Sequence, residues 1–157
     1  MDPGRTLTLA PSTVTSYMGV ARSFFDTNIL LYLYSDADRS KQKRAQELYR
    51  EHALAGTILI STQVVQEFYV AATRKLAIPR PTVRTLTEAL LDLPLVIVNP
   101  THLRSAVDNE LRHQISFWDA LILAAADSGG ATVLYTEDLN DGQQYGRVSV
   151  RNPFRPI

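Results

Sequence analysis

The sequence predicts an α/β protein of three layers, in which a mostly parallel central sheet lies between helices. Three short apolar segments, 57–60, 95–98 and 132–135, have the continuous pattern of strands that are buried on both faces. Helical patterns separate these segments, and strands that alternate with helices are typical of a parallel sheet. The chain has 157 residues and no cysteine, so we expect one domain with an ordinary hydrophobic core.

The first elements follow from capping and turn residues. Residues 1–21 hold several turn-formers and no clear period, so we expect a flexible extension, and the sequence leaves open whether Met1 or Met18 is the start. Residues 23–25 are expected to form a strand and 29–34 a short helix. Ser40 is the expected N-cap of a helix over 41–53, which Gly56 closes.

The later elements repeat the alternation. After the strand at 57–60, Ser61 or Thr62 caps a helix that ends near residue 76, and Pro81 suits the first turn of a helix that ends near residue 91. Further helices are expected over 101–113 and 117–127, and strands at 95–98, 132–135 and 148–150. In such sheets ligands bind beyond the carboxyl ends of the strands, so functional residues are sought there.

Composition narrows the class of protein. Sixteen basic side chains balance sixteen acidic ones, so the total charge does not mark a nucleic-acid binder. No apolar run approaches the roughly 18 residues of a membrane span, and the N-terminal residues lack the apolar core of a signal peptide, so we expect a cytoplasmic protein. Without cysteine there is no zinc–thiolate site, and we interpret His52, His102 and His113 as surface or helix-end residues.

Two acidic residues follow predicted strands. Asp26 comes directly after the strand at 23–25, where an Asx-turn is the alternative explanation. Asp138 follows the strand at 132–135. Its neighbours Glu137 and Asp141 compete for the same role, and a solvated acidic turn would explain all of them, but we favour Asp138.

Two further acids lie on helices in apolar company. Glu67 shares a helix face with Val64 and Ala71, where a carboxylate is costly unless it meets a cation; a position at the edge of the stripe, or a pair with Arg74, is the alternative. Asp119 is the only charge in residues 117–126, a segment apolar on every face and expected to be buried. The spacing from Ser116 to Asp119 also suits a helix capping box.

Together the four acids predict a metal site. Converging carboxylates repel one another in a partly desolvated pocket, so they persist as anions only beside a cation. Their hard oxygen ligands favour Mg²⁺ or Mn²⁺ over zinc.

Basic residues form two clusters in the sequence. The first contains Arg39, Lys41, Lys43 and Arg44, and the second contains Arg74, Lys75, Arg80 and Arg84. Each cluster fits a solvated helix face or a phosphate-binding surface.

In this order and setting, the acids resemble those of the PIN-domain family of metal-dependent nucleases, and within it the VapC-type ribonuclease toxins. The resemblance spans about residues 23 to 152. The segments that carry it are Phe25-Asp26-Thr27-Asn28, Gln66-Glu67-Phe68, Ser116-Phe117-Trp118-Asp119-Ala120-Leu121-Ile122 and Tyr135-Thr136-Glu137-Asp138-Leu139-Asn140-Asp141-Gly142. No single motif is specific, but the ordered set is, and the N-terminal extension departs from the compact family pattern.

The resemblance implies a PIN-like nuclease domain over residues 22–157 that hydrolyses RNA internally, leaving a 5′-phosphate and a 3′-hydroxyl. Mg²⁺, or Mn²⁺, would be held by Asp26 and Asp119 directly, with Glu67 and Asp138 completing the site or acting as base. A homodimer and a cognate antitoxin are the implied partners. Residues expected to orient the carboxylates are Thr27, Asn28, Ser116 and Thr136, and those expected to contact RNA are Arg39, Lys41, Lys43 and Arg44.

Three alternatives remain open. A DNA or flap nuclease would keep the fold, but such enzymes are usually longer. A phosphatase that forms an aspartyl-phosphate resembles a DxD pattern, whereas Asn28 takes the third position here and no lysine follows Lys75. A non-catalytic interaction protein of the same fold would be expected to have lost one of the acids, and all four are present.

Overall fold

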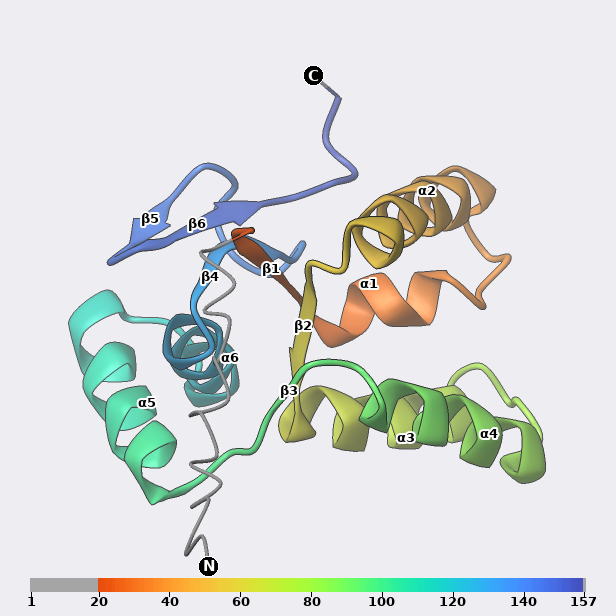
Figure 1. Ribbon diagram of the computed structural model, residues 1–157, viewed down its shortest axis with the longest axis horizontal. Helices are drawn as coiled ribbons and strands as arrows, with labels where there is room; N and C mark the ends of the chain where they lie inside the picture. The colour runs from red at the N-terminus through yellow and green to blue at the C-terminus, as the bar shows by residue number, and fades with distance from the viewer. Residues whose placement is uncertain (1–19, 157) are drawn as a thin grey trace, which may run out of the picture.

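The computed structural model describes residues 20–156, so the expected extension over residues 1–21 lies almost wholly outside the described residues. Six strands form one sheet in the order β3-β2-β1-β4-β6-β5, in which only β5 pairs antiparallel (Figure 1). Their bounds are β1 Arg22–Phe25, β2 Ile58–Ser61, β3 Leu95–Val96, β4 Ala131–Tyr135, β5 Gln144–Tyr145 and β6 Val148–Arg151.

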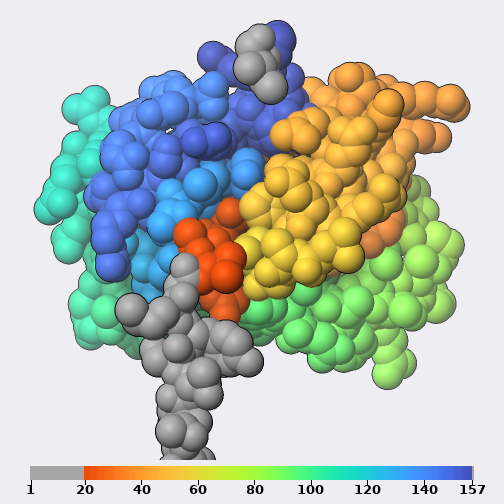
Figure 2. Space-filling view, turned by 45° about the horizontal axis from the view of Figure 1, so that its top comes forward, coloured from red at the N-terminus to blue at the C-terminus, as the bar shows by residue number. Residues whose placement is uncertain are grey.

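Six helices in the described residues join these strands, and the predicted α/β class with a mostly parallel sheet is confirmed. Their bounds are α1 Thr27–Tyr32, α2 Arg39–Ala55, α3 Thr62–Arg74, α4 Arg80–Leu91, α5 Pro100–His113 and α6 Phe117–Ser128. In Figure 1, α5 and α6 lie together on one side of the central strands, and α1 to α4 lie on the other side of the view. The space-filling view shows β1 between the segments of β2 and β4, as the strand order requires (Figure 2).

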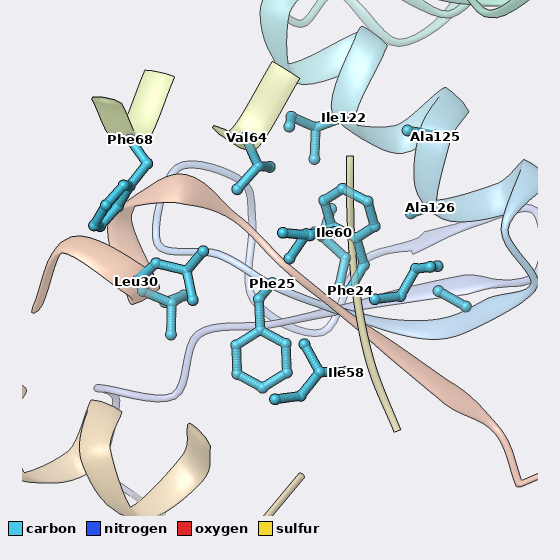
Figure 3. Packing of buried hydrophobic residues seen from close by; sticks show 14 of the residues in the cluster. Phe24, Phe25, Leu30, Ile58, Ile60, Val64, Phe68, Ile122, Ala125 and Ala126 are labelled. Carbon is cyan, nitrogen blue, oxygen red and sulfur yellow. The ribbon is translucent and has the colours of Figure 1, made fainter. Parts of the chain in front are cut away.

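The core covers both faces of the central strand. Phe24 and Phe25 are fully buried neighbours in β1 and point to opposite sides, as successive strand residues do (Figure 3). The ring of Phe25 packs edge-on against Tyr49 and His52 of α2. The opposite face is covered by α6, whose residues 120–126 are all buried. None of the described helices is long and apolar enough to cross a membrane.

Capping residues that were expected from the sequence occur at two helix ends, and a different residue caps a third. Gly56 ends α2 in the left-handed conformation with φ 68°, and Ser61 caps α3 through Val64 N. Asp38, not Ser40, caps α2, because its carboxylate accepts a hydrogen bond from Lys41 N at 3.0 Å. Carboxylates and hydroxyls are comparable caps, so the sequence pattern did not separate these two residues.

The second half of the chain differs from the expectations in two strands. The strand expected at 95–98 ends at Val96, because Val98 N donates to the side-chain oxygen of Thr62 at 3.1 Å instead of continuing the ladder. The short strand β5 was not expected. His102, expected at the surface or at a helix end, lies in the first turn of α5 and is buried: its Nδ1 accepts from Asn99 N at 3.0 Å and its Nε2 lies 2.7 Å from Ser128 Oγ, so its polar atoms are satisfied.

Candidate active site

All four predicted acids line one pocket of about 730 Å³ at the carboxyl ends of β1 and β4. Asp26 follows β1, Asp138 lies three residues beyond β4, Glu67 comes from the middle of α3, and Asp119 from the first turn of α6. Segments far apart in the sequence therefore converge where a parallel sheet is expected to bind its ligand.

Asp26 is the most deeply held of the acids, with its side chain only 5% exposed. Its Oδ1 accepts from Thr27 N and its Oδ2 from the hydroxyl of Thr136, both at 2.7 Å. Asp26 is also the N-cap of α1, so the local turn role and the pocket position coexist. Burial raises the pKa of Asp26 to about 7; the two hydrogen bonds oppose this increase, and the negative charges of Asp138 and Glu67 add to it.

Glu67 is fixed by two donors that approach its two oxygens. The hydroxyl of Thr27 donates to Oε2 at 2.6 Å, and the amide of Gln63 donates to Oε1 at 2.8 Å. The same amide nitrogen of Gln63 also donates to the carbonyl of Trp118 at 3.2 Å, which links α3 to the start of α6. The alternative pair with Arg74 does not form in the described residues, where the ion pairs join Lys41 to Glu137 and Arg147 to Asp127.

The other two acids of the pocket are Asp119, in α6, and Asp138, in the loop after β4. Ser116 caps α6 by accepting from Asp119 N at 3.1 Å, which places the Asp119 carboxylate in the first turn of the helix. Asp138 Oδ2 accepts from the side-chain amide of Asn28 at 2.8 Å. Partial burial raises the pKa of Asp138, and the nearby charges of Asp119 and Glu137 raise it further.

The two acids that compete with Asp138 in sequence are held elsewhere. Glu137 pairs with Lys41 at 2.8 Å and accepts from the hydroxyl of Tyr32 at 2.7 Å. Asp141 accepts a hydrogen bond from the backbone N of Asn152, the residue that follows β6, at 2.8 Å. Neither residue lines the acidic pocket, and Asp138 does.

The carboxylate oxygens of the pocket are suitable ligands for a divalent cation. Within residues 20–156, no ion pair engages any of the four acids, and the raised pKa values of Asp26 and Asp138 show that their negative charge is poorly compensated. Oxygen-only ligands of this kind fit Mg²⁺ or Mn²⁺. As they are oriented, no three acidic or histidine side chains in the described residues converge closely enough to hold one ion. Asp26, Glu67 and Asp138 accept hydrogen bonds from neighbouring side chains instead.

The remaining predicted residues divide into two groups. Thr27 and Asn28 line the pocket, the buried hydroxyl of Thr136 donates to Asp26, and the hydroxyl of Ser116 accepts from the backbone of Asp119 rather than contacting a carboxylate. The basic residues of α2 lie outside the pocket: Lys41 bonds Glu137, and Arg44 donates to the carbonyl of Pro153 at 3.2 Å. The exposed side chains of Arg39 and Lys43 belong to the same helix.

Sequence reasoning did not assign several lining residues to the pocket, among them Gln63, Arg74, Lys75 and Trp118. Gln63 lies four residues before Glu67, on the same face of α3, and this spacing is the signal that could have identified it. Arg74 and Lys75 were recognised as part of a basic cluster, and Arg74 otherwise only as an alternative ion-pair partner of Glu67. Trp118 had been assigned to a helix buried on all sides, yet its side chain is 62% exposed.

Comparison with known proteins agrees with the fold. A family model described as the PIN domain matches residues 23–143. Comparison with curated proteins gives no significant match.

Three solved structures share the fold at low sequence identity. VapC20 of Mycobacterium tuberculosis, described as a toxin that cleaves the sarcin–ricin loop, has a TM-score of 0.62 and 22% identity over 74% of this chain and 89% of that one. A toxin–antitoxin complex from Klebsiella pneumoniae gives 0.61 and 22%, over 83% and 97% of the two chains. A DNA-bound VapBC complex from Salmonella typhimurium gives 0.61 and 16%, over 85% and 98%.

Proposed function

Because the chain belongs to the PIN-domain family, we propose that it is a divalent-metal-dependent endoribonuclease of the VapC type, the toxin of a toxin–antitoxin pair. The observation that carries the proposal is that Asp26, Glu67, Asp119 and Asp138 line one pocket and that none of them forms an ion pair among the described residues. A purely structural arrangement of these acids would be expected to neutralise at least some of them with basic side chains.

The chain's own residues would hold the ion and the substrate in place. Asp26 and Asp119 are the proposed direct ligands, and Glu67 and Asp138 would complete the site or accept a proton. Bound there, Mg²⁺ or Mn²⁺ would offset the charge of the phosphodiester and make an attacking water more acidic. Thr27 and Thr136 keep the Asp26 carboxylate in a fixed orientation, and Thr27 also fixes Glu67, so one residue couples two ligands.

RNA phosphates are the proposed partners of the basic residues. Arg74 and Lys75 line the same pocket as the four acids, where they would receive phosphates beside the scissile bond. Arg39, Lys41, Lys43 and Arg44 on α2 would contact a more distant part of the strand. Binding through these residues should weaken steeply with added salt, because each phosphate contact releases counterions.

A cognate antitoxin and a homodimer are the proposed protein partners. The fold likeness to a protein solved in a toxin–antitoxin complex supports the first of these. An antitoxin segment that brought a basic side chain into the acidic pocket would neutralise its excess charge and block the metal site.

Cleavage of a mixed pool of labelled RNAs, in Mg²⁺ or Mn²⁺, tests the proposal. The purified protein must be free of co-purified antitoxin, and matched reactions use EDTA and the Asp26→Asn protein. Asp36→Asn, an exposed acid outside the pocket, is the matched control variant. We expect metal-dependent cleavage that Asp26→Asn abolishes and Asp36→Asn preserves. Equal activity of wild type and Asp26→Asn would refute the assignment, and cleavage of DNA in preference to RNA would change the substrate class.

A further inference from the structure

We propose that Trp118 is a base-stacking platform at the mouth of the carboxylate pocket, and that the substrate is therefore bound as single-stranded RNA with an unstacked base beside the scissile phosphate. The inference rests on the proposed function and deepens it, because it names the form of the RNA. It is carried by the exposure of Trp118, by its link to Glu67 and by the side chains around it.

The exposure of Trp118 is unusual for its position. It is the only tryptophan of the chain and the second residue of α6, a helix whose residues 120–126 are all buried. Its own side chain is 62% exposed and lines the pocket that contains the four acids. A large aromatic side chain left in water gives up the free energy of burial, so its position calls for an explanation other than core packing.

The position of Trp118 relative to the acids is fixed through the backbone. Its carbonyl accepts from the Gln63 amide, which also bonds Glu67 Oε1, so one side chain spans Trp118 and Glu67. The next residue is Asp119. The ring of Phe117 lies 5.4 Å from the indole at 75°, an edge-to-face contact that restricts the indole on one side.

The surroundings of Trp118 combine apolar and cationic side chains. Leu31, Val70 and Ile122 line the same pocket, as do Arg74 and Lys75, which form no ion pair in the described residues. A nucleotide presents a flat apolar base and a negative phosphate, and these two groups match an exposed indole and two nearby cations. Bases inside a duplex are already stacked on both faces, so only a single strand or a flipped base can use the indole.

Intrinsic fluorescence reports directly on this contact, because Trp118 is the sole tryptophan. The full-length protein is titrated, in EDTA and low salt, with an unstructured RNA oligonucleotide and with the same strand annealed to its complement. We expect the single strand to quench the emission in a saturable way and the duplex to have little effect. Absence of quenching by the single strand, or equal quenching by the duplex, would overturn the proposal. Contact with a protein partner would then be the alternative explanation for the exposure of Trp118.

Steady-state kinetics separate this inference from the proposed function. Trp118→Ala should raise KM for a cleaved RNA roughly tenfold or more, and Trp118→Phe should retain most of the affinity because it keeps an aromatic face. Leu111→Ala, an exposed residue of α5 outside the pocket, is the matched control. If the wild-type protein cleaves no RNA, the proposed function fails; if it cleaves and Trp118→Ala leaves KM unchanged, the proposed function survives and this inference is wrong.

Discussion

Replacing Asp26 by asparagine should make the metal-free protein more stable at alkaline pH, even though it removes a proposed metal ligand. The reason is the buried position of Asp26, which raises its pKa from 3.8 to about 7. As pH rises through this interval, the unfolded chain releases the proton of Asp26 while the folded chain retains it. Folding stability therefore falls between about pH 4 and pH 7 and stays low above pH 7. Asparagine carries no such proton, so the variant loses this dependence.

The size of the effect follows from the same two pKa values. Their difference of about 3 corresponds, at about 1.4 kcal/mol for each pH unit, to an upper limit of roughly 4 kcal/mol. Asparagine keeps an oxygen for Thr27 N or for Thr136 but not for both, which costs about 1 kcal/mol of hydrogen bonding. The net gain above pH 7 is then about 3 kcal/mol, or roughly 6–12 °C in Tm for a chain of this length.

The assay is thermal unfolding in EDTA at a series of pH values from about 5 to about 8.5, with wild type and Asp26→Asn side by side. The difference between the two proteins reports Asp26 together with the acids whose charges interact with it, Asp138 and Glu67. His52, whose pKa is lowered by burial, is not among the groups that shift the pKa of Asp26, so it contributes to each curve alike. Asp36→Asn serves as the control for a charge change at the surface.

Two results would refute the reasoning. A Tm difference between Asp26→Asn and wild type that does not change with pH would mean that Asp26 ionises as easily in the folded protein as in the unfolded chain. A variant less stable than wild type above pH 7 would mean that the hydrogen bonds from Thr27 and Thr136 outweigh the cost of burying the charge.

Three further predictions concern single contacts. Gly129→Ala should lower stability by about 1–3 kcal/mol in denaturant unfolding, because its Cβ would lie 2.5 Å from a methyl carbon of Leu59 and 2.8 Å from one of Val96; a neutral result would show that these side chains move aside easily. Glu137→Gln should keep cleavage activity and cost less than about 1 kcal/mol, whereas Asp138→Asn should lose activity, and the opposite pattern in cleavage assays would exchange their roles. Gln63→Leu should lower kcat roughly tenfold with little change in Tm, because it removes the donor to Glu67 together with a buried amide oxygen that has no partner among the described residues; unchanged kcat would show that Glu67 needs no such support.

The acids could be predicted from the sequence because their positions depend on local signals. Asp26 follows an apolar strand directly, Asp138 lies three residues after another, and Asp119 follows a serine at capping distance, so each acid lies near the end of a strand or the start of a helix. Once the strands are parallel, their carboxyl ends meet at one edge without further information. From the sequence we favoured Asp138 over Glu137 without a contact to explain it, and the structure supplies one, because Lys41 and Tyr32 from another part of the chain bind Glu137.

What the sequence did not predict depends on packing between distant elements. The strand β5 has two residues and exists through its antiparallel pairing with β6. His102 is buried because Ser128 of α6 and the backbone of Asn99 satisfy its ring nitrogens. An all-apolar segment gives no period, so the pattern of residues 117–126 did not show that Trp118 faces the solvent and residues 120–126 the core.

The same hydrogen bonds that keep the acids in place explain why the fold tolerates them. Each oxygen of Asp26 and of Glu67 accepts a hydrogen bond from a neutral donor, and among residues 20–156 no ion pair with these acids would have to be broken before a cation binds. A basic partner for Asp26 would lower its pKa and stabilise the empty protein, but it would also compete with a divalent ion for the same oxygens. The raised pKa of Asp26 is therefore the stability cost of a site that remains free to bind metal, and relieving it by mutation should exchange activity for stability.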